Sequence, residues 1–93
     1  MTDTQHRAFV DAVDAVLADL RDLLIRKNAD YGNSALEPVR IFSDASPVEQ
    51  IRVRIDDKLS RIARGDDAGE DTRMDLMGYL ILERIAETGS PDE

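Results

Sequence analysis

The sequence predicts an all-α fold, and three observations support this prediction. Apolar residues recur at steps of three and four over 3–27, 47–64 and 70–87, a spacing that lines them along one helix face. No segment shows the two-residue alternation of a strand. The 93 residues form a single domain, 1–93, and a chain of this size buries roughly 60–65% of its unfolded surface. We therefore expect three main helices, with a short helical turn in the long first loop, to assemble as a helical-bundle oligomer.

Composition excludes several classes of protein. The chain has no Cys and one His, His6, which excludes disulfides and disfavours a zinc site. The N-terminal stretch "MTDTQHR" is polar, and no apolar run approaches the ~20 residues of a membrane span. The net charge of −8 disfavours duplex nucleic acid, because phosphates are repelled. We expect a cytoplasmic protein with neither a membrane nor a duplex partner.

The first helix is expected over 3–27, with Thr4 or Asp3 as its N-cap and an end near Asn28, before Gly32. Its apolar face consists of Phe9, Val13, Val16, Leu17, Leu20, Leu23 and Leu24. The segment 28–46 then reads as an irregular connection of about 19 residues, long against the about 2–8 that usually join two helices. We expect it to be ordered and functional, with a short turn in "ALEPVRIF" that puts Val39, Ile41 and Phe42 into the core.

The second helix is expected over 47–64. Ser46 is its N-cap, Pro47 its first residue, and Gly65 its C-terminal stop. The core stripe is Val48, Ile51, Ile55, Leu59 and Ile62.

The third helix is expected over 70–87, after an acidic turn and before a frayed tail, 88–93. Its apolar residues lie on several sides, which predicts a central helix and a subunit interface.

Two acids on the third helix are candidate metal ligands. Asp71 and Asp75 are four residues apart, so both carboxylates share a face with Tyr79. Such a pair can hold Mg²⁺ on the phosphates of a substrate. Alternatively, the acids only stabilise the N-terminus of the helix.

The second helix carries a basic island within an acidic chain. Arg54, Lys58 and Arg61 recur at steps of three and four, and Lys58 borders the apolar stripe, where its ammonium group can reach a phosphate. Alternatively, this is a solvated face whose Asp57 and Arg61 pair within the helix. Arg52, on the opposite flank, is placed to pair with acids of the third helix.

The stretch "KNADYGNSAL" at 27–36 gathers polar groups that can face a ligand. Lys27 is a cation, Tyr31 offers a stacking surface, and Asn33 offers a short polar group, with Asp30 beside them. The alternative is a structured turn with Tyr31 half-buried. No nucleophile–base pair and no GxxxxGK loop occur in the sequence.

Three pieces, "RKNADYGNS", "IRVRIDDKLSRIARG" and "EDTRMDLMGYLIL", together resemble a phage and prophage nucleotide-modification-associated domain family. That family is distantly similar to the MazG-like all-α nucleoside triphosphate pyrophosphatases. The resemblance covers residues 26 to 82. It implies an oligomer, a nucleotide or nucleotide-derived ligand, and Mg²⁺ held by acids, in the cytoplasm of a host cell if the chain is phage-encoded.

The residue match to MazG-like enzymes is partial. Asp75 matches the Asp of their second acidic pair, and its partner would be Asp71 or Glu70. Where those enzymes carry the first pair, this chain has Asp56 and Asp57 followed by Lys58 and Arg61.

Two nucleotide-handling functions therefore remain open, besides a helical interaction module whose extra apolar face is only an interface. One is Mg²⁺-dependent hydrolysis of a nucleotide to monophosphate and pyrophosphate by Asp71 and Asp75. The other is non-catalytic, oligomeric sequestration of a linear or cyclic nucleotide signal of host defence. In both, the predicted nucleotide-binding residues are Lys27, Asp30, Tyr31, Asn33, Arg54, Lys58, Arg61 and Tyr79.

Overall fold

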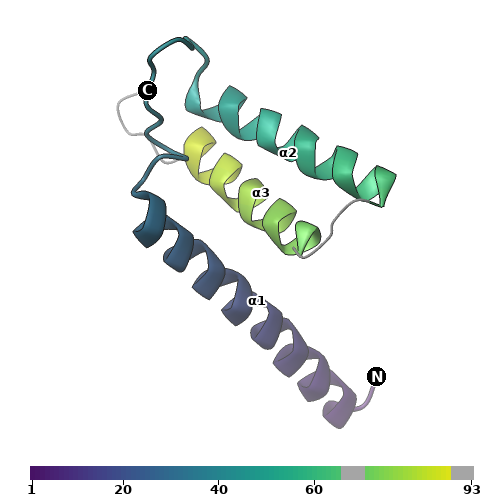
Figure 1. Cartoon of the computed structure of the whole chain (residues 1–93). Helices are drawn as coiled ribbons and strands as arrows, with labels where there is room; N and C mark the ends of the chain where they lie inside the picture. The colour runs from purple at the N-terminus through teal and green to yellow at the C-terminus, as the bar shows by residue number, and fades with distance from the viewer. Residues whose placement is uncertain (66–70, 89–93) are drawn as a thin grey trace.

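The computed structural model describes residues 1–65 and 71–88 and contains three α-helices (Figure 1). They are α1, Asp3–Tyr31; α2, Pro47–Arg64; and α3, Thr72–Thr88. The described residues contain no strand, so the all-α prediction is confirmed. α3 packs against both other helices, and most extensively against α2, as its apolar residues on several sides predict. None of the helices in the described ranges is long and apolar enough to cross a membrane.

α1 begins at residue 3, as its sequence pattern predicts, but ends four residues later than predicted. Its N-cap is Thr2, not Thr4 or Asp3: the Thr2 hydroxyl accepts from the Gln5 N–H at 3.1 Å. The Gln5 side chain in turn accepts from the Thr2 N–H at 2.8 Å. The helix then continues past residue 27 to Tyr31 and stops only at Gly32, whose φ of 63° suits a residue without a Cβ. "KNADY" is therefore the last helical turn and not part of a loop.

The connection between α1 and α2 starts with a single hydrogen-bonded turn. The carbonyl of Asn33 accepts from the N–H groups of Leu36 and Glu37, at 3.1 and 2.7 Å. This turn spans 33–37 and overlaps only the first residues of "ALEPVRIF", where the short helical turn is predicted. The prediction that the rest of the segment fills the core is wrong. Val39 and Ile41 are exposed, and Phe42 is 99% exposed, because within the described residues no element covers this stretch.

α2 has the predicted caps and is tied to α3 by one arginine. The Ser46 hydroxyl accepts from the Glu49 N–H at 3.2 Å, and Gly65 ends the helix at φ 70°. Arg52 donates to Glu83 and to Glu87 of α3, each at 2.8 Å, which confirms the predicted pairing with acids of the third helix. These hydrogen bonds raise the pKa of Arg52 above its ordinary value, and the hydrogen bond to Glu83 has the largest effect.

α3 is capped by Asp71, whose side chain accepts from the Met74 N–H at 3.0 Å. The helix therefore begins at Thr72. Glu70, where it was expected to begin, lies outside the described residues, as do the rest of the predicted acidic turn (66–69) and all of the predicted tail beyond Thr88.

A glycine allows α1 and α3 to approach closely. Gly78 is buried on α3, and a Cβ at this position would lie 3.2 Å from Leu24 Cδ2 and 3.9 Å from Leu20 Cδ1. Leu20 is itself buried, so the contact between the two helices centres on this point.

We expect Gly78→Val to lower the free energy of unfolding by about 1–3 kcal/mol, because the branched side chain must push Leu24 away from α3. Urea unfolding followed by circular dichroism measures this change. Leu80→Val is the control, since it introduces the same side chain at an exposed position of α3 and is expected to cost less than about 0.7 kcal/mol. Equal losses in the two variants would contradict the close contact at Gly78.

Candidate functional site

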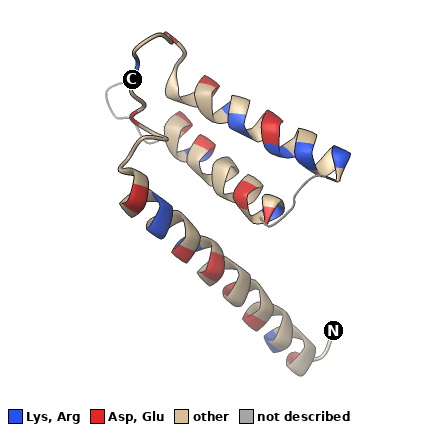
Figure 2. Ribbon diagram, in the orientation of Figure 1, with Lys and Arg blue, Asp and Glu red and all other residues tan. Residues whose placement is uncertain are grey.

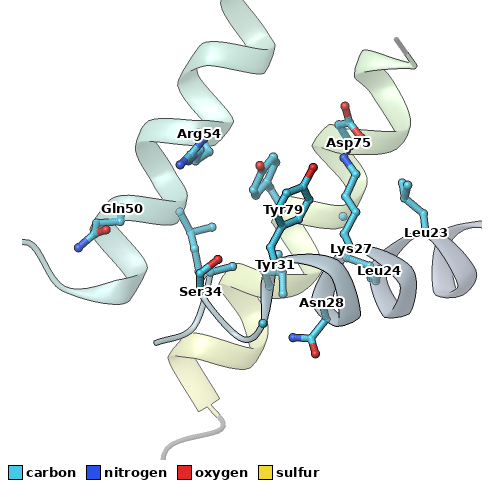
Figure 3. Close-up of a pocket in the computed structure, with 15 residues that line it drawn as sticks. Leu23, Leu24, Lys27, Asn28, Tyr31, Ser34, Gln50, Arg54, Asp75 and Tyr79 are labelled. Atoms are coloured by element: carbon cyan, nitrogen blue, oxygen red, sulfur yellow. Dashed lines mark hydrogen bonds and ion pairs between the residues drawn. The ribbon is translucent and has the colours of Figure 1, made fainter. Parts of the chain in front are cut away.

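A cleft opens where the last turn of α1 faces the first halves of α2 and α3 (Figure 3). Its volume is about 420 Å³, within the range of roughly 300–1,000 Å³ typical of small-molecule sites. Both polar and apolar side chains line it. The lining residues are Leu23, Leu24, Lys27, Asn28, Tyr31, Gly32, Ser34, Ala35, Gln50, Ile51, Arg54, Asp75, Gly78, Tyr79 and Leu82.

Both tyrosines of the chain line this cleft. Tyr31 comes from the end of α1 and is 71% exposed, whereas Tyr79 comes from α3 and is half-buried. Figure 3 shows the two rings in the space between α1 and α2. The extension of α1 explains the position of Tyr31: Leu20, Leu24, Lys27 and Tyr31 fall at helical spacing and share one face. The cleft therefore offers two aromatic surfaces.

The carboxylate of Asp75 joins all three helices. One oxygen lies 3.0 Å from Lys27 Nζ of α1, and the other lies 3.9 Å from Lys58 Nζ of α2. The side chains of Asp75 and Lys58 are only 11% and 12% exposed. The carboxylate of Asp75 thus faces two ammonium groups at a largely buried position beside the cleft.

Arg54 supplies a further cation. It lies on α2, lines the cleft and is exposed. Within the described residues it makes no hydrogen bond and no ion pair, in contrast to its neighbour Arg52, which binds two glutamates. Figure 2 shows basic residues along α2, while α1 carries mostly acidic ones. A guanidinium that makes no ion pair within the described ranges is a ready partner for an anion.

Two of the predicted metal ligands, Asp71 and Asp75, have other partners within the described residues. Asp71 uses its carboxylate to cap α3, and Glu70 lies outside the described residues. Asp75 lines the cleft, but its two oxygens face the ammonium groups of Lys27 and Lys58. In the described parts of the chain, no three His, Cys, Asp or Glu side chains come together as a group that could hold a metal ion. A divalent cation at Asp75 would have to displace lysines.

The structure brings together some of the predicted site residues and leaves others apart. Lys27, Tyr31, Arg54, Asp75 and Tyr79 line the cleft, and Lys58 contacts Asp75 beside it.

Three predicted ligand residues lie outside the cleft lining. Asn33 accepts from Asn28 at 2.9 Å and closes the end of α1. Arg61 pairs with Asp57 at 3.2 Å, in agreement with the alternative of an internal ion pair. Asp30 is exposed on α1.

Sequence reasoning missed Gln50 as a lining residue. Its amide also donates to the Ala45 carbonyl at 2.9 Å. Gln50 lies four residues before Arg54 and therefore shares its helix face, and this spacing could have predicted Gln50 as a lining residue.

The chain matched no family model, no curated protein and no solved structure in these comparisons. The resemblance to nucleotide-modification-associated and MazG-like proteins therefore stays a prediction.

Proposed function

We propose that the cleft binds a nucleotide, with the base against the tyrosines and a phosphate on Arg54. The observation that carries this proposal is that Arg54, which makes no ion pair within the described residues, lines the same cleft as both tyrosine rings (Figure 3). A nucleotide has the two matching parts, a flat ring system and an anion. Aromatic side chains stack on bases, with roughly 1–3 kcal/mol for each base, and arginine binds phosphate with two parallel hydrogen bonds.

The lysines at Asp75 strengthen the anion end of the site. Lys27 and Lys58 each carry a positive charge at the cleft edge, and both face the carboxylate of Asp75. When a phosphate reaches this edge, Lys27 can exchange part of its contact with Asp75 for a contact with phosphate oxygen. Binding of this kind requires no metal ion, so we expect affinity for a nucleotide in the absence of Mg²⁺.

Mg²⁺-dependent hydrolysis to monophosphate and pyrophosphate is the second candidate. The observation in its favour is that Asp75, the acid expected to hold the metal, lines the same cleft as Arg54 and Lys27. Asp75, with Asp71 or Glu70, would hold Mg²⁺, which would neutralise phosphate charge. Because the lysines must first leave Asp75, we expect Mg²⁺ alone to bind poorly and to enter only together with phosphates.

Calorimetric titration of the purified protein tests both candidates. The ligands are nucleosides, mononucleotides, triphosphates and cyclic dinucleotides, each with EDTA and with Mg²⁺, and the recovered ligand is analysed by mass spectrometry. Sequestration predicts saturable binding in EDTA, weaker binding of the nucleoside, and intact ligand. Binding and pyrophosphate release that both require Mg²⁺ would establish the second candidate instead. Absence of binding to every phosphate-bearing ligand would refute both.

A further inference from the structure

The apolar face of α1 extends beyond the part of the helix that is packed. Leu20 and Leu24 pack at Gly78 of α3. Phe9, Val13 and Val16 continue the same face toward the N-terminus at steps of three and four, yet all three are exposed. This half of α1 projects away from α2 and α3 (Figure 1). Half of an amphipathic helix therefore presents its apolar side to solvent.

A second apolar surface lies at the opposite half of the same helix. It is a groove between α1 and α3, lined by Leu17, Leu20, Arg21, Leu24, Ile25 and Ile81. Ile85, one turn further along α3, is also exposed. Arg21 is the one charged residue in the lining, so the groove fits the apolar face of a helix.

We propose that a second copy of this chain occupies the groove, with the two α1 helices packed antiparallel. The N-terminal half of each α1 then lies in the groove of the other copy. Since Leu17 is the midpoint of Asp3–Tyr31, the two-fold axis passes close to this residue. One antiparallel contact covers both exposed surfaces of both copies at once, and a contact of this self-complementary type closes at two subunits.

The exposed area matches what a dimer requires. Phe9, Val10, Val13, Val16, Leu17, Ile25 and Ile81 are each 37–60% exposed. Together they leave roughly 500 Å² of apolar surface on each copy, close to the apolar share of the about 800 Å² per partner in a standard interface. The single chain has little core to set against this surface: among the described residues, Leu20 and Ile51 are the buried hydrophobic ones. Small domains with so limited a core are commonly stabilised by association.

Charge disfavours the other possible occupants. α1 carries six Asp against four Arg and Lys, so an anionic membrane surface or a nucleic acid would be repelled along its length. The exposed loop residues Val39, Ile41 and Phe42 are the remaining apolar candidates for the groove. They lie on a short irregular stretch, which covers less of the groove and leaves the N-terminal half of α1 exposed.

The dimer does not depend on the proposed nucleotide binding, and ligand-free protein tests it. Light scattering coupled to size exclusion should give twice the chain mass of 10.4 kDa. Val16→Glu places a carboxylate in the proposed interface close to the axis, opposite apolar residues of the second copy, and should give a monomer. Val39→Glu, the same change on the exposed loop, should leave the dimer intact. A wild-type monomer, or a dimer that dissociates with Val39→Glu and not with Val16→Glu, would overturn the proposal.

Cysteine cross-linking tests the arrangement even if Val16→Glu does not fold. The chain has no cysteine, so Leu17→Cys carries a single thiol. A short bismaleimide should join two copies at this position, because the two thiols face each other across the axis. Phe42→Cys, equally a single thiol and fully exposed, should stay largely uncoupled. Efficient coupling at 42 with none at 17 would show that another surface mediates association.

Discussion

Asp75→Asn is expected to make the protein less stable and its nucleotide binding tighter. The carboxylate of Asp75 contacts Lys27 and Lys58 at a largely buried position where three helices meet. Its loss leaves two ammonium groups without their shared anion and should lower the free energy of unfolding by about 1–3 kcal/mol. The same change raises the positive charge at the cleft edge. A phosphate then replaces the missing carboxylate, and we expect affinity to rise by about tenfold, equivalent to about 1.4 kcal/mol.

The measurements are urea unfolding with and without nucleotide, and calorimetric titration in EDTA. Asp57→Asn is the matched control, because Asp57 pairs with Arg61 on an exposed face, with side chains 51% and 38% exposed. It should change stability by less than about 1 kcal/mol and leave affinity unchanged. The hydrolytic candidate makes the opposite prediction for Asp75→Asn, loss of Mg²⁺-dependent turnover and of Mg²⁺-dependent affinity. A fall in affinity in EDTA would contradict the role assigned to the lysines.

Arg54→Ala should weaken nucleotide binding by about 10- to 100-fold, because a hydrogen bond to a charged group contributes about 1.5–3 kcal/mol. Stability should change little, since Arg54 is exposed and makes no ion pair within the described residues. Arg54→Lys keeps the charge but not the two-pronged geometry, and should recover only part of the affinity.

Arg40→Ala provides the comparison for this variant. It removes the same charge from an exposed position outside the cleft lining, so binding should be retained. If Arg54→Ala and Arg40→Ala weaken binding equally, the loss of affinity comes from the change in overall charge. That result would contradict the proposed contact between the phosphate and Arg54.

Local sequence signals predicted the helices well, because each helix is specified by its own period and caps. Ser46, Pro47 and Gly65 bound α2 as predicted. The end of α1 was misplaced because Asn28 and Asp30 read as loop residues. No residue before Gly32 is unable to stay helical, so the helix continues. This difference matters for function, since it turns Lys27 and Tyr31 into neighbours on a rigid helix face.

The Asp75 cluster could not be predicted from spacing. Lys27 and Asp75 are 48 residues apart in sequence, and their contact depends on how α1 packs on α3 at Gly78. Sequence reasoning saw two acids four residues apart and predicted a metal pair. In the structure Asp71 caps the helix while Asp75 binds lysines, because α1 and α2 both present cations at this level.

Whether the apolar residues of the connection between α1 and α2 are buried also depends on contacts with distant parts of the chain. Val39, Ile41 and Phe42 were expected in the core because apolar residues in a long connection usually need cover. In this chain no described element reaches them.

The most direct test of nucleotide binding in the cleft is NMR of protein labelled on the tyrosine rings. Tyr31 and Tyr79 are the two tyrosines of the chain and both line the cleft, so every labelled ring reports on the site. Titration with a nucleotide in EDTA should shift both sets of ring resonances saturably, because a stacked base changes the local magnetic field. In Arg54→Ala the same shifts should require a much higher nucleotide concentration. Ring resonances that stay unchanged while calorimetry detects binding would place the nucleotide elsewhere and contradict the proposed site.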